Sequence, residues 1–86
     1  MQEALNQANL AKDISEVPIG AVVVKDSQII GYGFNQNISM HSVAAHAEII
    51  AINQASKFIR NYRLIDCDLY VTVEPCHMCA KAIVDA

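Results

Sequence analysis

The segment Pro18–Phe34, which reads PIGAVVVKDSQIIGYGF, decides the fold of this 86-residue chain. Its two halves, residues 19–24 and 29–34, are rich in β-branched and aromatic residues, which favour extended strands. A polar run at 25–28 separates the two halves and is typical of a turn. The sequence therefore predicts a β-hairpin, and the other elements are placed around it.

Helical periodicity lies on both sides of this hairpin. Residues 1–13 carry apolar side chains at helical spacing, and they predict an amphipathic helix whose start lacks a capping residue, as if the N-terminus were trimmed. A polar connection is expected over residues 35–41. Ser42 is then expected to cap a second helix that runs to about Phe58.

A third strand is expected at residues 69–73, where Pro75 ends it, and a third helix from Cys76 to Ala86. The order helix, hairpin, helix, strand, helix predicts an α/β fold in which a helical crossover joins the third strand to the hairpin. We expect residues 1–86 to form a single domain that is incomplete at its C-terminal end, because the third strand would keep an open edge.

The bulk composition limits the class of protein. Hydrophobic residues make up 53% and charged residues 17%, which excludes a disordered chain. No apolar run approaches the roughly 18 residues of a membrane span, and no signal peptide is recognisable, so a cytoplasmic protein without a membrane partner is expected.

The net charge of −3 lacks the basic footprint of a nucleic-acid-binding protein. One stretch is locally basic, and two interpretations of it remain open: a contact with phosphates, or a solvated loop after a helix. Its residues are Lys57, Arg60, Asn61, Tyr62 and Arg63.

The cysteine spacing indicates metal chemistry. Cys76 and Cys79 stand three apart at the expected start of a helix, so both thiolates can reach one ion, and His46 at the start of another helix is the natural third ligand. Three protein ligands leave the fourth position of a tetrahedral Zn²⁺ open, as in catalytic sites. Cys67 stands alone in an apolar stretch and is interpreted as a small buried hydrophobe without a role.

Glu48 follows His46 by two residues. Residues two apart on a helix do not share a face, so Glu48 is expected to act on protons rather than as a metal ligand. Each feature has a plain alternative: a lone CxxC also occurs in redox motifs and zinc ribbons, and a lone His or Glu is usually structural or solvated. Together, however, H-x-E followed by P-C-x-x-C is the known signature of zinc-dependent nucleobase deaminases.

Beyond these motifs, the chain resembles the tRNA-specific adenosine deaminases along nearly its whole length. The resemblance is carried by the segments at 16–22, 33–35, 45–49, 61–64 and 69–76, which read EVPIGAV, GFN, AHAEI, NYRL and LYVTVEPC. It implies a cytidine-deaminase-like fold, a three-layer α-β-α sandwich with a mixed sheet. It also implies one zinc per chain, a homodimer, and the conversion of the wobble adenosine of a tRNA anticodon to inosine.

The resemblance also implies roles for individual residues. Zinc-activated water would attack C6 of the adenine while Glu48 transfers a proton to the ring nitrogen and then to the departing ammonia. Five further residues match positions that contact the flipped-out nucleoside: Asn35 by a hydrogen bond, the backbones of Ala47 and Pro75 along the base, and the apolar side chains of Val17 and Ile38.

The chain departs from the family pattern in three respects. Residues 42–44 are Ser-Val-Ala where Asp-Pro-Thr is common, and Lys81 stands where glycine is usual, near the expected dimer surface. Two further strands and the C-terminal helices of the family are not in these 86 residues. Two alternatives remain open: a deaminase of guanine or cytosine, and a non-catalytic zinc-binding partner subunit of a tRNA deaminase.

Overall fold

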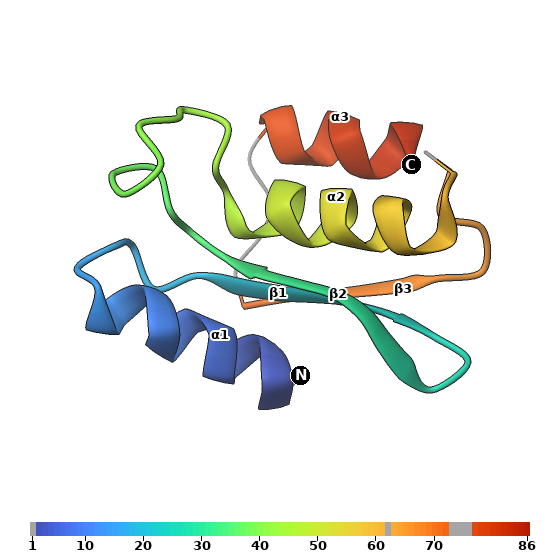
Figure 1. The fold of residues 1–86 in the computed structure, drawn as a ribbon, viewed down its shortest axis with the longest axis horizontal. Coiled ribbons are helices and arrows are strands. Elements are labelled where there is room, and N and C mark those ends of the chain that lie inside the picture. Colours follow the sequence, from blue (N-terminus) through green and yellow to red (C-terminus); the bar gives the residue numbers. More distant parts are fainter. Residues whose placement is uncertain (1, 62, 73–76) are drawn as a thin grey trace.

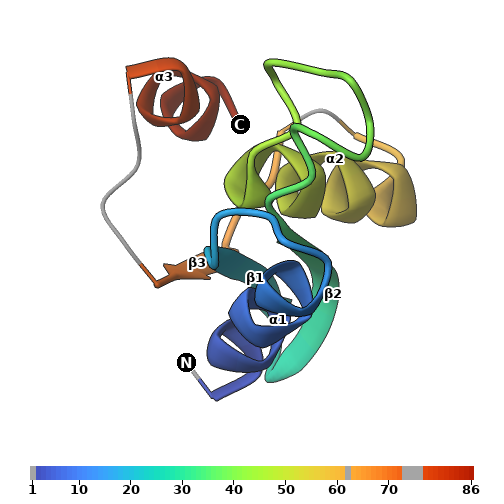
Figure 2. The ribbon, with the colours of Figure 1, turned by 90° about the vertical axis from the view of Figure 1, so that its left-hand side faces the viewer.

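Helices cover both faces of a three-stranded sheet in the computed structural model (Figure 1). The structure describes residues 2–61, 63–72 and 77–86. Helix α1 (Gln2–Asp13) lies against one face of the sheet, while α2 (Ala47–Ile59) and α3 (His77–Asp85) lie on the other (Figure 2). This arrangement is the expected three-layer α-β-α sandwich.

The sheet has the strand order β2-β1-β3. Strands β1 (Gly20–Lys25) and β2 (Gln28–Phe34) form the predicted hairpin, and β3 (Asp68–Val71) pairs with the other side of β1. Helix α2 connects β2 to β3 across the sheet, so the predicted helical crossover is confirmed. Both pairings are antiparallel, so the parallel pairing expected of a mixed sheet is not found among the described strands.

The hairpin turn and a β-bulge shape the sheet. Asp26 and Ser27 form a two-residue turn with φ of 51° and 63°, the left-handed values that match the twist of a hairpin. Val23 pairs with Gly31 but Val24 pairs with Ile29, which leaves Ile30 as an extra residue on β2. Such a bulge increases the local twist of the strands.

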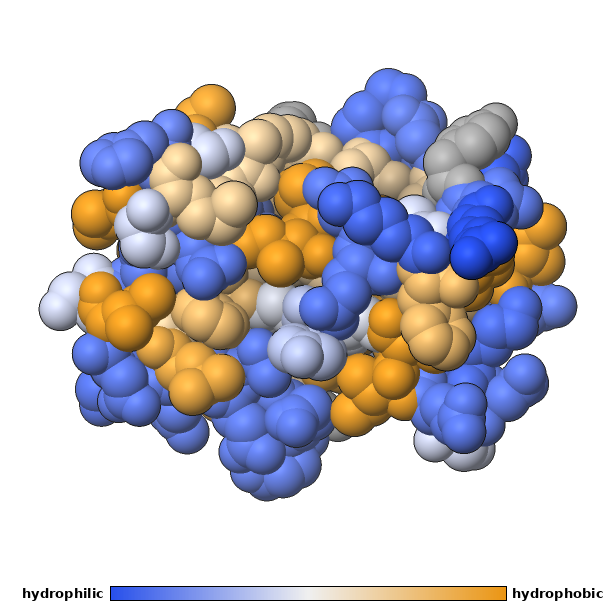
Figure 3. Space-filling model, in the orientation of Figure 1, coloured by the Kyte–Doolittle hydropathy of each residue, from blue (hydrophilic) through white to orange (hydrophobic). Residues whose placement is uncertain are grey.

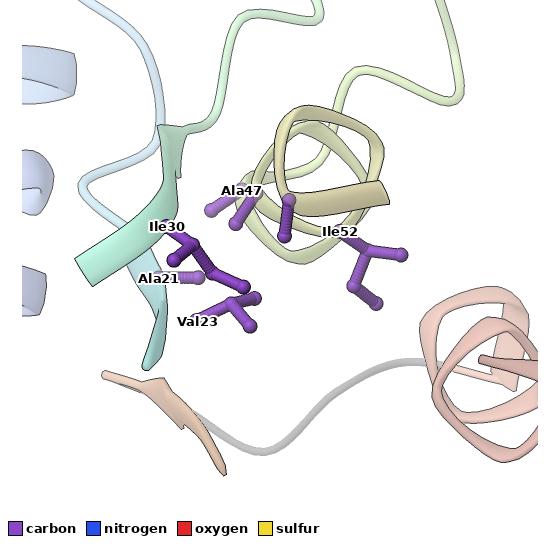
Figure 4. Close-up of a cluster of buried hydrophobic side chains, with 7 residues drawn as sticks. Ala21, Val23, Ile30, Ala47 and Ile52 are labelled. Carbon is purple, nitrogen blue, oxygen red and sulfur yellow. The ribbon is translucent and has the colours of Figure 1, made fainter. Parts of the chain in front are cut away.

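The core lies between the sheet and α2 (Figure 4). Small side chains on α2 let it approach β2 closely, and the glycines of β2 complete the fit. A Cβ atom added at Gly31 would lie 2.3 Å from the carbonyl oxygen of Ala51, which is backbone and cannot move aside. The buried members of this cluster are Ala21, Val23, Ile30, Ala47, Ala51, Ile52 and Ala55.

The expected helix cap at Ser42 is wrong, because α2 begins only at Ala47. Residues 37–41 and 43–44 instead form turns. The side-chain amide of Asn37 donates to the carbonyls of Ser42 and Val43 at 2.8 and 3.1 Å, and the Ser42 hydroxyl accepts the N–H of Ala44 at 3.3 Å. These local hydrogen bonds compete with helix formation and delay its start.

The outer edge of β2 is bonded by a side chain from α2. The Tyr32 N–H donates to the Gln54 carboxamide oxygen at 2.8 Å.

Among the described residues, no helix is both long and apolar enough to cross a bilayer.

Candidate functional site

Two of the predicted zinc ligands meet where two helices begin. His46 is the N-cap residue of α2, and Cys79 lies in the first turn of α3 and is fully buried. The Nδ1 atom of His46 lies 3.4 Å from the Sγ atom of Cys79, although 33 positions separate the two residues in the chain. The fold therefore brings together one residue from each of the two motifs that the sequence singled out.

This distance fits a shared zinc ion. Imidazole nitrogen binds zinc at about 2.0 Å and thiolate sulfur at about 2.3 Å, so two such ligands on one tetrahedral ion lie about 3.5 Å apart. One nitrogen and two sulfur donors also suit zinc, which binds both types. The third predicted ligand, Cys76, lies outside the described residues, as does Pro75 of the predicted base pocket.

Glu48 is buried and follows His46 by two residues. It is the second residue of α2 and only 3% of its surface is exposed. Burying a carboxylate is costly unless the surroundings compensate for it, and glutamate is among the residues least often buried. The solvated surface glutamate that the sequence left open is therefore excluded, and the carboxylate lies two residues from the candidate metal ligand His46.

Asn35 connects the end of β2 to the start of α2. Its side-chain oxygen accepts the N–H of Ala47 at 2.8 Å, and its own N–H donates to the carbonyl of Ile19 at 3.1 Å. Asn35 is 5% exposed and Ala47 is fully buried. Because the His46 side chain makes no cap hydrogen bond, Asn35 supplies the cap of α2 from a distant part of the chain.

Replacing Asn35 with Ala is expected to lower the free energy of unfolding by about 1 to 2 kcal/mol, because the buried Ala47 N–H loses its acceptor. Asn35→Asp keeps the acceptor at the same place and should lose less stability than Asn35→Ala, because the helix N-terminus offsets part of the cost of burying the charge. Urea denaturation measures both. Asn53→Ala on the exposed face of α2 is the matched control, and an equal loss there would contradict the capping role.

Val17 and Ile38, the predicted apolar contacts, are exposed at the same end of the sheet. Their exposed fractions are 58% and 69%, and Val17 directly precedes the proline before β1 while Ile38 lies in the connection from β2 to α2. Apolar residues are interspersed among polar ones at this end, which is the left-hand end in Figures 1 and 3. We call this end of the sheet, with its two exposed apolar residues Val17 and Ile38, the rim.

Glu16 joins the two connections at this rim, and sequence reasoning gave it no role. Its carboxylate accepts the N–H groups of Ile38 and Ser39 at 3.2 and 2.7 Å. Burial acts to raise the pKa of Glu16, but the hydrogen bonds from Ser39 and Ile38 outweigh it and hold the pKa below its ordinary value of 4.5. No local motif marks Glu16, because its partners lie 22 and 23 positions further along the chain.

The locally basic stretch lies at the opposite end of α2 from His46. Lys57 is in the last turn and Arg60 is the C-cap, so a helix of 13 residues, about 20 Å at 1.5 Å per residue, separates them from the site. Arg63 donates from Nε to the carbonyl of Ala86 at 3.2 Å. Tyr62 lies outside the described residues. Lys57 and Arg60 therefore do not border His46.

Cys67 is half-buried and packs against the core cluster, as its interpretation as a small hydrophobe expects. Its Sγ atom lies 3.6 Å from the carbonyl oxygen of Ile65.

The fold and the site together define an α-β-α domain in which two helix starts bring a histidine and a cysteine close enough to share a metal ion, with a buried glutamate two residues after the histidine. The family model of the cytidine and deoxycytidylate deaminase zinc-binding region matches residues 1–86, and the chain belongs to this zinc-binding family. The predicted cytidine-deaminase-like fold is thereby confirmed.

Curated relatives with similar sequences are named as tRNA deaminases. The chain is 49% identical over all of its 86 residues to the tRNA-specific adenosine deaminase of Buchnera aphidicola subsp. Schizaphis graminum, of which it covers 57%. It is 51% identical over the same length to the chloroplastic tRNA(adenine(34)) deaminase of Arabidopsis thaliana, of which it covers 7%. The chain thus spans little more than half the length of the bacterial relative.

Solved structures share the fold closely. One, from a study of A-to-I editing by tRNA:A34 deaminases, superposes with a TM-score of 0.93 at 47% identity over 96% of this chain and 64% of that one. The guanine deaminase of Bacillus subtilis also gives a TM-score of 0.93, at 40% identity over 96% of this chain and 54% of that one. Fold similarity alone therefore does not separate these two activities.

Proposed function

We propose that the protein carries out zinc-dependent hydrolytic deamination of adenosine to inosine at the wobble position of tRNA. The observation that carries the proposal is the 3.4 Å approach of His46 Nδ1 to Cys79 Sγ, together with the burial of Glu48 two residues after His46. The choice of substrate is supported by relatives near 50% identity that are named tRNA adenosine deaminases.

The chain's own residues divide the chemistry between them. His46, Cys76 and Cys79 would hold the zinc, which when bound supplies a Lewis acid that activates water near neutral pH. The Glu48 carboxylate accepts a proton from the attacking water and delivers it to N1 of the adenine ring. It then takes a second proton from the new hydroxyl group at C6 and passes it to the amino group on the same carbon. One C–O bond forms at C6, one C–N bond breaks, and ammonia leaves.

Asn35 is proposed to bind the nucleoside through its side-chain nitrogen. Its oxygen is already occupied by the Ala47 N–H, so the two Nδ2 hydrogens are the donors that remain for a substrate acceptor. The backbones of Ala47 and Pro75 are proposed to border the base. The target base must leave its stack to reach the metal, and the exposed apolar side chains of Val17 and Ile38 suit contact with the extruded nucleoside.

We further propose a cytoplasmic homodimer. The resemblance to the family implies the dimer, and large apolar side chains that remain exposed on the helices support an interface with a second chain. Phe58 on α2 and Val84 on α3 are 69% and 77% exposed. Exposed apolar surface of this kind is typical of association sites when it is contiguous.

Deamination of a free base is the second candidate function, and the guanine deaminase structure at 40% identity supports it. The zinc and the glutamate serve either substrate equally. A non-catalytic partner subunit is less well supported, because Glu48 is both present and buried, two residues after the candidate metal ligand His46. A subunit that only positioned RNA would have no need of this carboxylate.

The test compares substrates on the protein at its natural length, loaded with zinc. An anticodon stem-loop with adenosine at the wobble position should yield inosine and ammonia. The same loop with guanosine at that position, free adenosine, free guanine and cytidine should react at least about 100-fold more slowly, because binding of the loop is used for catalysis. If free guanine reacts faster than the stem-loop with adenosine, the second candidate function is favoured. If the stem-loop yields no inosine, the proposal is refuted.

A further inference from the structure

The backbone of Glu16 is fixed by the way α1 ends. Ser15 adopts a left-handed conformation with φ of 63°, and its N–H donates to the carbonyl of Lys12 at 3.1 Å. The Glu16 N–H donates to the carbonyl of Ala11 at 2.9 Å. This pair of bonds is the Schellman motif, which closes a helix in a defined geometry. The helix end therefore sets where the Glu16 side chain starts.

The carboxylate of Glu16 grips the backbone of another connection. One oxygen accepts the Ile38 N–H at 3.2 Å and the other accepts the Ser39 N–H at 2.7 Å. Glu16 is only 6% exposed. Hydrogen bonds to an ionised acceptor in a sheltered position are stronger than neutral ones. The two N–H groups are adjacent, so the carboxylate holds this part of the backbone in both position and orientation.

The connection between β2 and α2 is also held at its start, where the Asn35 N–H donates to the carbonyl of Ile19 at 3.1 Å. The Gln36 N–H donates to the carbonyl of Ala45 at 2.9 Å, and the remaining bonds of the turns, such as Met40 N–H to the carbonyl of Gln36 at 2.9 Å, lie within the connection. Such internal bonds shape the connection but do not place it against the rest of the domain. Glu16 ties its outer part to the end of α1.

We propose that Glu16 is a positioning residue that sets the spacing between Val17 and Ile38, the two exposed apolar side chains of the rim. Val17 follows Glu16 directly, and Ile38 is one of the residues whose N–H the carboxylate holds. One hydrogen-bonded side chain thus fixes both sides of the rim. The inference rests on the proposed function, because the rim is where the extruded nucleoside would enter.

The expected effect is on substrate binding rather than on proton transfer. Glu16 does not reach the reacting atoms by itself; it acts through Ile38. A loosened rim should bind the nucleoside more weakly but leave Glu48 in place once the substrate is bound. KM should therefore rise while kcat changes little, a pattern that indicates lost binding common to the ground and transition states.

The test uses Glu16→Gln in the zinc-loaded protein at its natural length. The amide keeps one acceptor but turns an NH₂ group toward the second backbone N–H, which breaks that bond. KM for the anticodon stem-loop should rise about tenfold with kcat within about twofold. Amide hydrogen exchange at Ile38 and Ser39 should accelerate about tenfold, because their acceptor is weakened. Glu3→Gln, at a half-buried position of α1, is the matched control and should change neither quantity.

Glu16→Asp provides a second variant if the first does not fold. It keeps the charge but is one methylene shorter, so it should raise KM by an intermediate amount. Unchanged exchange at Ile38 and Ser39, or a fall in kcat with KM unchanged, would overturn the proposal. If the parent acts on guanine instead of tRNA, the proposed function fails, and the exchange rates together with KM for guanine still decide the role of Glu16.

Discussion

Replacing Glu48 with Gln is expected to lower kcat for deamination by about a thousandfold or more, which lies within the usual range for the loss of general acid–base catalysis. The amide has nearly the same shape as the carboxylate but cannot accept a proton from water or deliver one to N1. Zinc content should stay near one per chain, because Glu48 is not among the expected ligands. Single-turnover kinetics on the stem-loop and metal analysis of the same preparation measure both quantities.

The control for this experiment is a glutamate of the same domain that is far from the metal ligands. Glu3→Gln on α1 should keep the parent kcat, which would show that loss of a carboxylate elsewhere does not matter. KM for the stem-loop should change little in Glu48→Gln. A kcat within tenfold of the parent value would contradict the proton-transfer role, and loss of zinc from Glu48→Gln would show that the residue contributes to metal binding instead.

Replacing Gly31 with Ala is expected to lower the free energy of unfolding by about 3 kcal/mol or more, a large part of the stability of a small domain. The added Cβ would meet the Ala51 carbonyl oxygen at 2.3 Å and the Ala55 Cβ at 2.9 Å. Neither the strand nor the helix can retreat without opening the core between them. Thermal and urea denaturation of the protein measure the loss.

A double variant identifies which clash matters. Removing the Ala55 methyl group in Gly31→Ala/Ala55→Gly should not restore stability, because the nearer obstacle is the backbone of Ala51. Gln28→Ala, at an exposed position of the same strand, is the control and should cost under about 1 kcal/mol. Full recovery in the double variant would show that the helix backbone can shift, and that its close approach to β2 is not required.

The hairpin and the first helix could be predicted because their signals are local. Two β-branched runs around a polar turn specify β1 and β2, and helical spacing of apolar residues specifies α1 within a residue or two of its ends. The start of α2 could not be predicted in this way. Ser42 is a good capping residue, but Asn37 binds the carbonyl of Ser42 and draws the chain into turns.

The same difference between local and long-range signals applies to the candidate site. Cysteines three apart and a histidine at a helix start predicted that distant motifs would meet, and the structure places His46 and Cys79 3.4 Å apart. The sequence did not predict that Asn35 caps α2, or that the Glu16 carboxylate binds the backbone of Ile38 and Ser39. Each joins a side chain to a backbone N–H at least 12 positions away, and residue type alone does not reveal such a partner.

The hydrogen bond from Tyr32 to Gln54 bears on how copies of this chain behave in a crowded cell. An exposed edge strand offers unpaired N–H groups on which a foreign strand can pair, and this pairing is a common first step toward fibrils. Here the Gln54 carboxamide already accepts one of these donors from β2 at 2.8 Å. A strand arriving at that edge would have to displace a side chain held by the folded domain, so lateral growth of the sheet at β2 is disfavoured from the moment α2 docks.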